Sequence, residues 1–168
     1  MLSFDLQSLR TKAVTVQGEL DPGDPVWQEG DPLPSEPVRV SGRVTSAGED
    51  RYYWHGRIEG RAALPCRRCL GDAESAVSEE THVIFSEAGD SEDDPTVFEL
   101  DPGDHELDLR PAVREVWLLH LSKYPLCRDD CKGLCPTCGA DLNAGPCECP
   151  PKTDRRWDAL RKIGESQN

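Results

Sequence analysis

The sequence predicts an α+β protein: a mainly antiparallel sheet or open barrel, one long helix, a C-terminal cysteine-rich knob and a short final helix. Three observations lead to this prediction. Apolar and polar residues alternate over much of residues 38–85, as they do in half-buried strands. The apolar residues then change to helical spacing over residues 109–121. Six of the eight cysteines follow between positions 127 and 149. Strands followed by a separate helix are typical of the α+β class.

The first half of the chain predicts the strands of the sheet. Residues 1–16 hold a short amphipathic opening and then a strand, and the Pro-, Gly- and acid-rich residues 17–37 predict a loop. Residues 38–44 predict a strand that ends at a turn over 47–50. Residues 51–64 predict a long strand with a polar, largely basic face and an apolar face formed by Trp54, Ile58, Ala62 and Leu64.

The second half continues the sheet and then changes to helix. A further strand is expected over residues 74–85, and two short strands over 96–100 and 105–109. The helix over 109–121 has Asp108 as its expected N-cap and Pro111 in its first turn. A final helix is expected from residue 153 to Gly164. We expect a core domain over residues 1–124 and a metal-binding lobe over 125–168.

The charge of the chain is strongly acidic but unevenly distributed. The formal net charge is −13, and residues 17–36 and 87–108 together hold half of the 32 acidic residues without any Lys or Arg. Solvated loops are the ordinary interpretation of such runs, and an acidic arm that binds a partner is the alternative. The N-terminus shows no signal-peptide pattern and no segment is apolar enough for a membrane helix, so a cytoplasmic protein without a membrane partner is expected.

The eight cysteines fall into four close pairs: Cys66 and Cys69, Cys127 and Cys131, Cys135 and Cys138, and Cys147 and Cys149. A two-residue gap lets a tight turn aim two thiolates at one tetrahedral ion, and zinc binds sulfur at about 2.3 Å. Only eight residues separate the third pair from the fourth. The sequence therefore predicts a first site, similar to a small zinc ribbon, formed by Cys135, Cys138, Cys147 and Cys149.

The remaining cysteines are sufficient for a second site. The one-residue gap in the last pair is less usual, which leaves open that Cys127 or Cys131 replaces Cys147 or Cys149 in the first site. The second site would tie the end of the long strand to the lobe through Cys66, Cys69, Cys127 and Cys131. We therefore expect one or two Zn²⁺ ions per chain.

Other uses of clustered cysteines have less support. A thioredoxin-type pair opens a helix in a βαβ unit, and neither Cys66 nor Cys135 is followed by a helical apolar pattern. Structural disulfides form in oxidising compartments, whereas clustered cytosolic cysteines more often bind metal. An iron–sulfur cluster can use four such cysteines and remains an alternative.

No part of the sequence resembles an active site. Four thiolates leave zinc no open position for a water molecule, and Glu148 is the only acidic residue beside the ligands that could serve as a base. The sequence contains no nucleophile elbow, phosphate-binding loop or dinucleotide fingerprint. The histidines are scattered along the chain, and none is expected to be a ligand: His55, His82, His105 and His120. We expect a protein that is not an enzyme and has no small-molecule substrate.

Four blocks in this order resemble the YceD-like family of large-ribosomal-RNA accumulation proteins of bacteria and plastids. The blocks are LPCRRCL at 64–70, VREVWLLHL at 113–121, PLCRDDCKGLCPTCGADLN at 125–143 and DRRWDALRKI at 154–163. The resemblance implies a role in 23S rRNA accumulation and large-subunit ribosome biogenesis. Two positions depart from the family pattern, Asp141 in place of Asn and Arg155 in place of Pro. Some relatives lack much of the cysteine set, which implies a structural metal.

Two hypotheses follow for the partner. In the first, the chain contacts 23S rRNA or an assembly intermediate through basic side chains and one tyrosine, because Arg pairs phosphates and aromatic rings stack on unpaired bases. The candidates are Arg51, Tyr53, Arg57, Arg61, Arg67, Arg68, Arg128, Lys132, Arg155 and Arg156. In the second, the chain is an acidic protein–protein adaptor that docks a basic ribosomal protein without touching RNA.

Overall fold

The computed structural model describes residues 1–48, 51–87, 97–101 and 103–150. In chain order, the elements are β1 (Ser3–Asp5), α1 (Leu6–Thr11), β2 (Val14–Leu20), β3 (Val38–Ser46), β4 (Arg51–Pro65), β5 (Asp72–Glu87), β6 (Val97–Leu100), β7 (Glu106–Asp108) and α2 (Arg110–His120). The predicted final helix lies outside the described residues. The two-domain division at residue 124 stays a prediction.

Two open sheets contain all the described strands. The larger sheet has the order β2-β3-β4-β5-β6, antiparallel except for the parallel pair β5–β6, and the smaller sheet pairs β1 with β7. The α+β class with a mainly antiparallel sheet is confirmed. The described strands form no closed barrel, because β2 and β6 are the two edges of the larger sheet and do not pair with each other.

The alternation predicted for the long strand is the one observed. In β4 the side chains of Tyr52, Trp54, Ile58 and Ala62 are buried, whereas those of Arg51, His55, Arg57 and Arg61 are exposed. The valines of β3 and four apolar residues of β5 are buried on the same side: Ala73, Val77, Val83 and Phe85. The sheet therefore has one face toward the core and one toward solvent, as antiparallel sheets commonly do.

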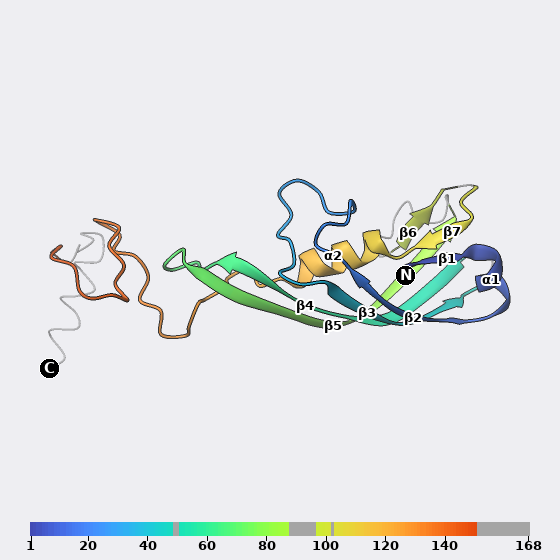
Figure 1. Ribbon diagram of the computed structural model, residues 1–168, viewed down its shortest axis with the longest axis horizontal. Helices are drawn as coiled ribbons and strands as arrows, with labels where there is room; N and C mark the ends of the chain where they lie inside the picture. The colour runs from blue at the N-terminus through green and yellow to red at the C-terminus, as the bar shows by residue number, and fades with distance from the viewer. Residues whose placement is uncertain (49–50, 88–96, 102, 151–168) are drawn as a thin grey trace, which may run out of the picture.

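Helix α2 covers the core face of the sheet (Figure 1). It buries Ala112, Val113, Val116 and Trp117 against the strands. The prediction of one long helix is not confirmed, because α2 has only 11 residues. Its N-cap is Leu109 instead of Asp108, whose carboxylate accepts hydrogen bonds from the backbone N–H and the guanidinium of Arg110.

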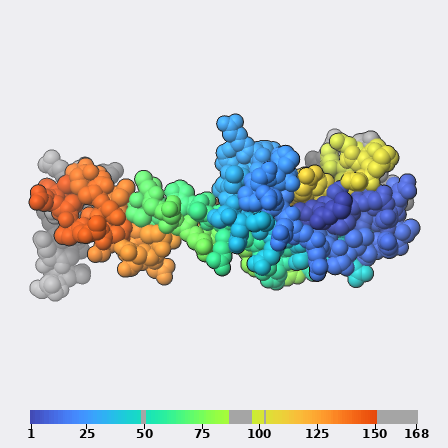
Figure 2. Space-filling model, in the orientation of Figure 1, coloured from blue at the N-terminus to red at the C-terminus, as the bar shows by residue number. Residues whose placement is uncertain are grey.

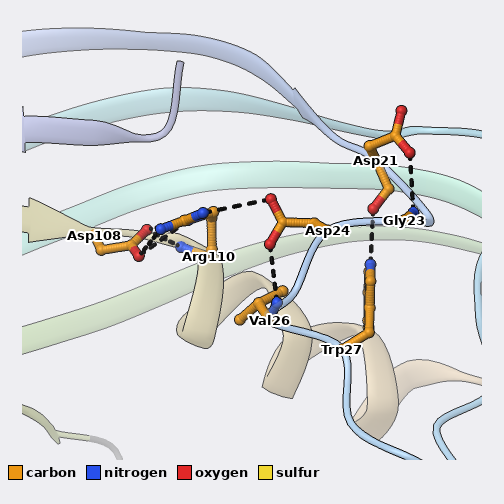
Figure 3. Close-up of polar contacts among 7 residues, drawn as sticks. All are labelled: Asp21, Gly23, Asp24, Val26, Trp27, Asp108 and Arg110. Carbon is orange, nitrogen blue, oxygen red and sulfur yellow. Dashed lines mark hydrogen bonds and ion pairs between the residues drawn. The ribbon is translucent and has the colours of Figure 1, made fainter.

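The loop between β2 and β3 packs over α2 and is held there by charge and aromatic contacts. Arg110 pairs with Asp24 and Asp108 (Figure 3). Arg114 donates two hydrogen bonds to Asp31, at 2.6 and 2.9 Å. The indole N–H of Trp117 donates to the Pro32 carbonyl. Two acidic residues of this loop, Asp24 and Asp31, are therefore paired with arginines of α2 and are not simply solvated charges.

The hairpin of β4 and β5 extends beyond the rest of the sheet (Figure 1). Strand β3 pairs with β4 only as far as Glu59, whereas β5 pairs with β4 as far as Pro65. The last rows of the hairpin are therefore a two-stranded ribbon. The cysteine-rich knob, residues 125–150, lies at the end of this ribbon, away from the loop over α2 (Figure 2).

Candidate metal centre and outer sheet face

The first group of thiols joins the tip of the β4–β5 hairpin to the chain that follows α2. Sulfur atoms of Cys66 and Cys131 lie 3.9 Å apart, and those of Cys69 and Cys127 lie 3.6 Å apart. All four sulfurs lie within 4.8 Å of one another. A small apolar cluster of Ala73 and Leu126 surrounds the buried Cys66 and Cys131.

These separations fit a tetrahedral ion and exclude disulfides in this structure. A disulfide joins two sulfurs at about 2.05 Å, and all eight cysteines are free. Four sulfurs bonded to one zinc at about 2.3 Å lie about 3.8 Å from each other. The sulfur–sulfur separations of 3.9 and 3.6 Å agree with that tetrahedron. The donor set of four thiols therefore fits Zn²⁺ in a closed, structural type of site.

The tip of the β4–β5 hairpin is a tight turn whose backbone amides lie close to the sulfur of Cys66. The amide of Cys66 donates to the Gly71 carbonyl, and the amide of Leu70 donates to the Cys66 carbonyl, which closes a tight turn with Leu70 at φ 61°. The amides of Cys69, Arg68 and Cys127 lower the pKa of the Cys66 thiol to about 6. A thiol that ionises this readily is suited to bind a cation, because the thiolate is the metal ligand.

The second group lies within the knob and consists of Cys135, Cys138, Cys147 and Cys149, again with sulfurs within 4.8 Å of one another. A tight turn places the first pair, since the Cys135 amide donates to Ala140 and the Gly139 amide to Cys135. The amides of Cys138 and Thr137 lower the pKa of Cys135 to about 6. The hydrogen bond between Cys149 and Cys138 raises the pKa of Cys149 to about 12.

The structure thus brings the eight thiols together in the two sets expected from their spacing. Neither Cys127 nor Cys131 replaces a member of the last pair. The identity of a bound metal stays a prediction.

The two thiol groups share side-chain contacts. Asn143, from the loop of the second group, donates from Nδ2 to the sulfur of Cys131 in the first group, at 3.6 Å. Its Oδ1 accepts from the amide of Lys132 and from the guanidinium of Arg128. Arg68 donates to the Cys131 carbonyl, and its own carbonyl accepts from the amide of Leu134. Two of the basic residues proposed for RNA, Arg68 and Arg128, therefore also hold the knob together.

The other proposed RNA-contacting residues have different positions. Arg51, Tyr53, Arg57 and Arg61 lie on the solvent side of β4, here called the outer sheet face. The guanidinium of Arg67 lies over the ring of Tyr124, at 4.3 Å from its centroid, near the knob. Lys132 is exposed in the knob. Arg155 and Arg156 lie outside the described residues.

Four further residues of the outer sheet face were not among the RNA candidates, although the alternation of the long strand already placed His55 on its polar face. Arg39 and Arg43 are exposed on β3 beside β4, and Arg43 is directly opposite His55. His55 is in turn directly opposite His82 of β5, and the two rings are stacked at 4.5 Å with an interplanar angle of 5°. In residues 38–44 the valines occupy even-numbered positions and the two arginines odd-numbered ones. The alternation that predicted the buried valines would therefore also have placed both arginines on the polar face.

The expectation that the histidines are scattered is wrong for this pair. Strand pairing brings His55 and His82 together although 26 residues lie between them. The Tyr53 hydroxyl forms a 2.5 Å hydrogen bond with Nδ1 of His82, and His55 Nε2 lies 2.6 Å from Glu80 Oε1. The hydrogen bond from His55 lowers the pKa of Glu80. The spacing of these residues along the sequence could not predict the cluster, because it forms only when β4 pairs with β5.

Comparison with known proteins places this arrangement in a family. The family described as large ribosomal RNA subunit accumulation protein YceD matches residues 54–164. The chain belongs to the YceD family. The match begins in β4 and includes the hairpin tip, α2 and both thiol groups.

Individual relatives of this YceD-family chain are similar over shorter stretches. An uncharacterized protein of Mycobacterium tuberculosis is 34% identical over 110 residues, which is 61% of this chain and 53% of that protein. The maize protein named large ribosomal RNA subunit accumulation protein YCED homolog 1, chloroplastic, is 34% identical over 61 residues, 36% of this chain and 21% of its own length. The chain spans about half the length of the mycobacterial relatives it matches. No solved structure matches.

The lengths and apolar content of the described helices bear on whether the chain could cross a membrane through a helix. None of them is both long enough and apolar enough to span a lipid bilayer.

Proposed function

We propose that the chain is a non-enzymatic, cytoplasmic factor that supports the accumulation of large-subunit rRNA, and that it contacts the rRNA or an assembly intermediate through the outer sheet face. The family name supports the process, since it refers to accumulation of the large-subunit RNA. In this proposal, zinc in the two thiol groups stabilises the knob and fixes it to the hairpin tip.

One observation supports the RNA contact most directly: three ring side chains lie side by side among arginines on a solvent-facing sheet. The rings are those of Tyr53, His82 and His55, with Tyr53 and His82 6.0 Å apart and His82 and His55 4.5 Å apart. Sheets that bind single-stranded RNA present rings for base stacking and nearby basic groups for phosphates. The surrounding arginines are Arg39, Arg43, Arg51, Arg57 and Arg61.

The ion pairs on this face do not prevent phosphate binding. Arg57 lies 3.9 Å from Glu80, and Arg61 lies 3.3 Å from Glu74. In both pairs each side chain is more than half exposed. Exposed pairs contribute little to stability because water screens them. An arginine can therefore exchange its carboxylate partner for an RNA phosphate at small cost.

The decisive experiment measures RNA binding by a charge-reversed outer sheet face. Arg43→Glu with Arg57→Glu is compared with Lys12→Glu with Lys123→Glu, which makes the same change in net charge outside the large sheet. Fluorescence anisotropy with transcribed segments of 23S rRNA is measured at several salt concentrations. We expect the first variant to lose at least about tenfold in affinity and to show a salt slope shallower by about two, since two phosphate contacts are lost.

The control variant should bind within about threefold of wild type, because distant charges act only through screened long-range attraction. Equal losses in both variants, or none in the first, would show that the outer sheet face is not the RNA contact.

The adaptor hypothesis is the alternative. Asp24 and Asp31 of the first acidic stretch are already paired with arginines of α2, which reduces the charge available to a basic protein. If the adaptor hypothesis holds, neutralising Glu92, Asp93 and Asp94 of the second stretch should abolish ribosomal-protein capture and leave RNA binding unchanged.

A further inference from the structure

We propose that His55, Glu80 and His82 form a third metal site, for Zn²⁺ or a similar divalent transition-metal ion, on the outer sheet face. Each residue offers one ligand atom, and these atoms lie within 4.8 Å of one another. Imidazole nitrogen together with carboxylate oxygen is a donor set that suits zinc, nickel and copper. The site shares no residue with the two thiol groups. It does share the His55 and His82 rings with the proposed RNA contact, but zinc binding is measured without RNA and does not require that contact.

Strand pairing builds the site from rigid backbone. His55 and His82 are directly opposite each other in the antiparallel pair β4–β5. Glu80 precedes His82 by two residues and so extends from the same face of β5. Because the β4–β5 ladder continues on both sides of these rows, the three side chains start from fixed positions. A ligand set fixed in this way needs less ordering when an ion binds.

The present hydrogen bonds resemble those of a metal site in which a proton occupies the place of the ion. His55 Nε2 and Glu80 Oε1 are 2.6 Å apart. Zinc at about 2.0–2.2 Å from each atom in a tetrahedron places them about 3.4 Å apart, so these two atoms must move apart by less than about 1 Å. The stacked His55 and His82 rings, at 5° from parallel, must also turn about their side-chain bonds, because each ring binds a metal in its own plane. Tyr53 holds Nδ1 of His82 through its hydroxyl and leaves Nε2 as the ligand. Metal-bound histidines commonly have such a partner on the other nitrogen.

Nearby arginines do not exclude a cation at this position. The Arg57 guanidinium lies 3.9 Å from Glu80 Oε2, on the oxygen that does not contact His55. His55 and Glu80 are 48% and 55% exposed, so water screens the repulsion between the guanidinium and the ion. The same exposure leaves coordination positions for water. We therefore expect weaker and faster-exchanging binding than in the thiol groups.

The test is a zinc titration followed at the histidine rings. Protein with its thiol groups saturated and free zinc removed is titrated with Zn²⁺ by calorimetry, and ¹H–¹⁵N spectra of the imidazole rings are recorded in parallel. We expect one additional equivalent, with signals of His55 and His82 shifting. His55→Ala and His82→Ala should each weaken this binding by at least about tenfold. His105→Ala, an exposed histidine outside the large sheet, is the matched control and should bind as wild type.

Acidification supplies a second readout. Lowering the pH from 7.5 to 5.5 should weaken the additional binding, because a histidine must be neutral to bind metal. Glu80→Gln keeps the side-chain shape and should also weaken binding, with folding checked by the amide spectrum. The ring signals report this site whatever the thiol groups hold. No additional equivalent, unchanged binding in the His55 and His82 variants, or shifts confined to His105 and His120 would each overturn the proposal.

Discussion

The sulfur of Cys66 lies at the junction of the hairpin and the knob and is fully buried. Its partners are three other thiols and the amides that lower its pKa. Four thiolates close together are stable only when a cation balances their charge. Single cysteines should therefore control metal content one group at a time.

The first prediction concerns this metal content. After dialysis of all samples against a mild chelator, which removes weakly bound ions, elemental mass spectrometry is expected to find two zinc ions per chain in wild type and one each in Cys66→Ser and Cys138→Ser. Each substitution removes a ligand from one group only, so each variant is the control for the other. Two zinc ions in both variants, or iron in the wild type, would contradict the assignment.

The second prediction concerns a glycine in the middle of the sheet. A Cβ at Gly56 would lie 2.3 Å from the Ser41 carbonyl oxygen and 2.4 Å from Nε1 of Trp54, both too close. We expect Gly56→Ala to lower the free energy of unfolding by about 1–3 kcal/mol, as overpacking does. Urea unfolding measures the change. Gly23→Ala, where a Cβ meets only a side-chain atom at 3.4 Å, should cost less than about 1 kcal/mol.

Residue-level prediction succeeded where chemistry is local. Cysteine spacing favoured the two sets of thiols that the structure brings together, and left open only whether Cys127 or Cys131 replaces a member of the last pair. It failed to show that Arg68 bonds to Cys131, because that contact joins segments far apart in the sequence, or that Arg128 bonds to Asn143 within the knob. A charged side chain gives no sequence signal of whether its partner is a phosphate or a neighbouring carbonyl.

At the scale of elements, the loop over α2 depends on its ion pairs. Arg114 and Asp31 are mostly shielded, at 20% and 11% exposure. The hydrogen bonds from Arg114 lower the pKa of Asp31 below its ordinary value of 3.8. A carboxyl with a lowered pKa stabilises the folded state above its ordinary pKa, and this contribution is lost as the pH falls through the folded-state value.

The third prediction follows from that pH dependence. Asp31→Asn should lower the free energy of unfolding by about 1–3 kcal/mol at pH 7, the range for hydrogen bonds to charged groups. The difference from wild type should shrink as the pH falls below about 4, where Asp31 of the unfolded chain takes up a proton first, and should vanish once the pH is below the lower pKa of the folded state. Denaturant unfolding at several pH values measures both. Glu29→Gln, exposed in the same loop, should have little effect; a pH-independent difference for Asp31→Asn would contradict the assignment.

Strands and helices were predicted well where their pattern is local in the sequence, and poorly where their pairing depends on distant residues. Strands β3, β4 and β5 follow from alternation of single residues, so their faces were predicted correctly. The pairing of β1 with β7 joins residues about 100 positions apart, and the parallel addition of β6 to β5 depends on tertiary contacts. The short α2 ends at His120, because the backbone of its C-cap residue Leu121 is extended although the apolar pattern continues to that residue.

At the scale of the whole molecule, the knob and the sheet have separate sources of stability. The sheet and α2 bury a continuous apolar core, whereas the knob contributes only a few apolar side chains around its thiols. Small lobes of this kind depend on metal or cross-links, because they bury too little apolar surface.

The fourth prediction is that metal removal unfolds only one end of the molecule. After chelation, amides of residues 125–150 should lose protection from hydrogen exchange, and amides of β2, β3 and the paired rows of β4 should keep it. Exchange measured by mass spectrometry on peptic fragments distinguishes the two regions. Loss of protection throughout the sheet would show that the metal supports the entire fold.

The two-stranded ribbon at the end of β4 and β5 separates the knob from the rest of the sheet by a fixed distance. A strand of 15 residues at about 3.3 Å per residue spans about 50 Å, and the thiol groups close its far end. If the outer sheet face binds RNA as proposed, the molecule has a binding face at one end and a knob at the other, and it is a spacer of fixed length. If both ends bind the same particle, the second contact forms at a high effective concentration only where the two targets are one strand length apart. The affinity for the particle would then depend on the distance between its two contact sites. A compact precursor and a fully extended RNA would therefore be bound with different affinities.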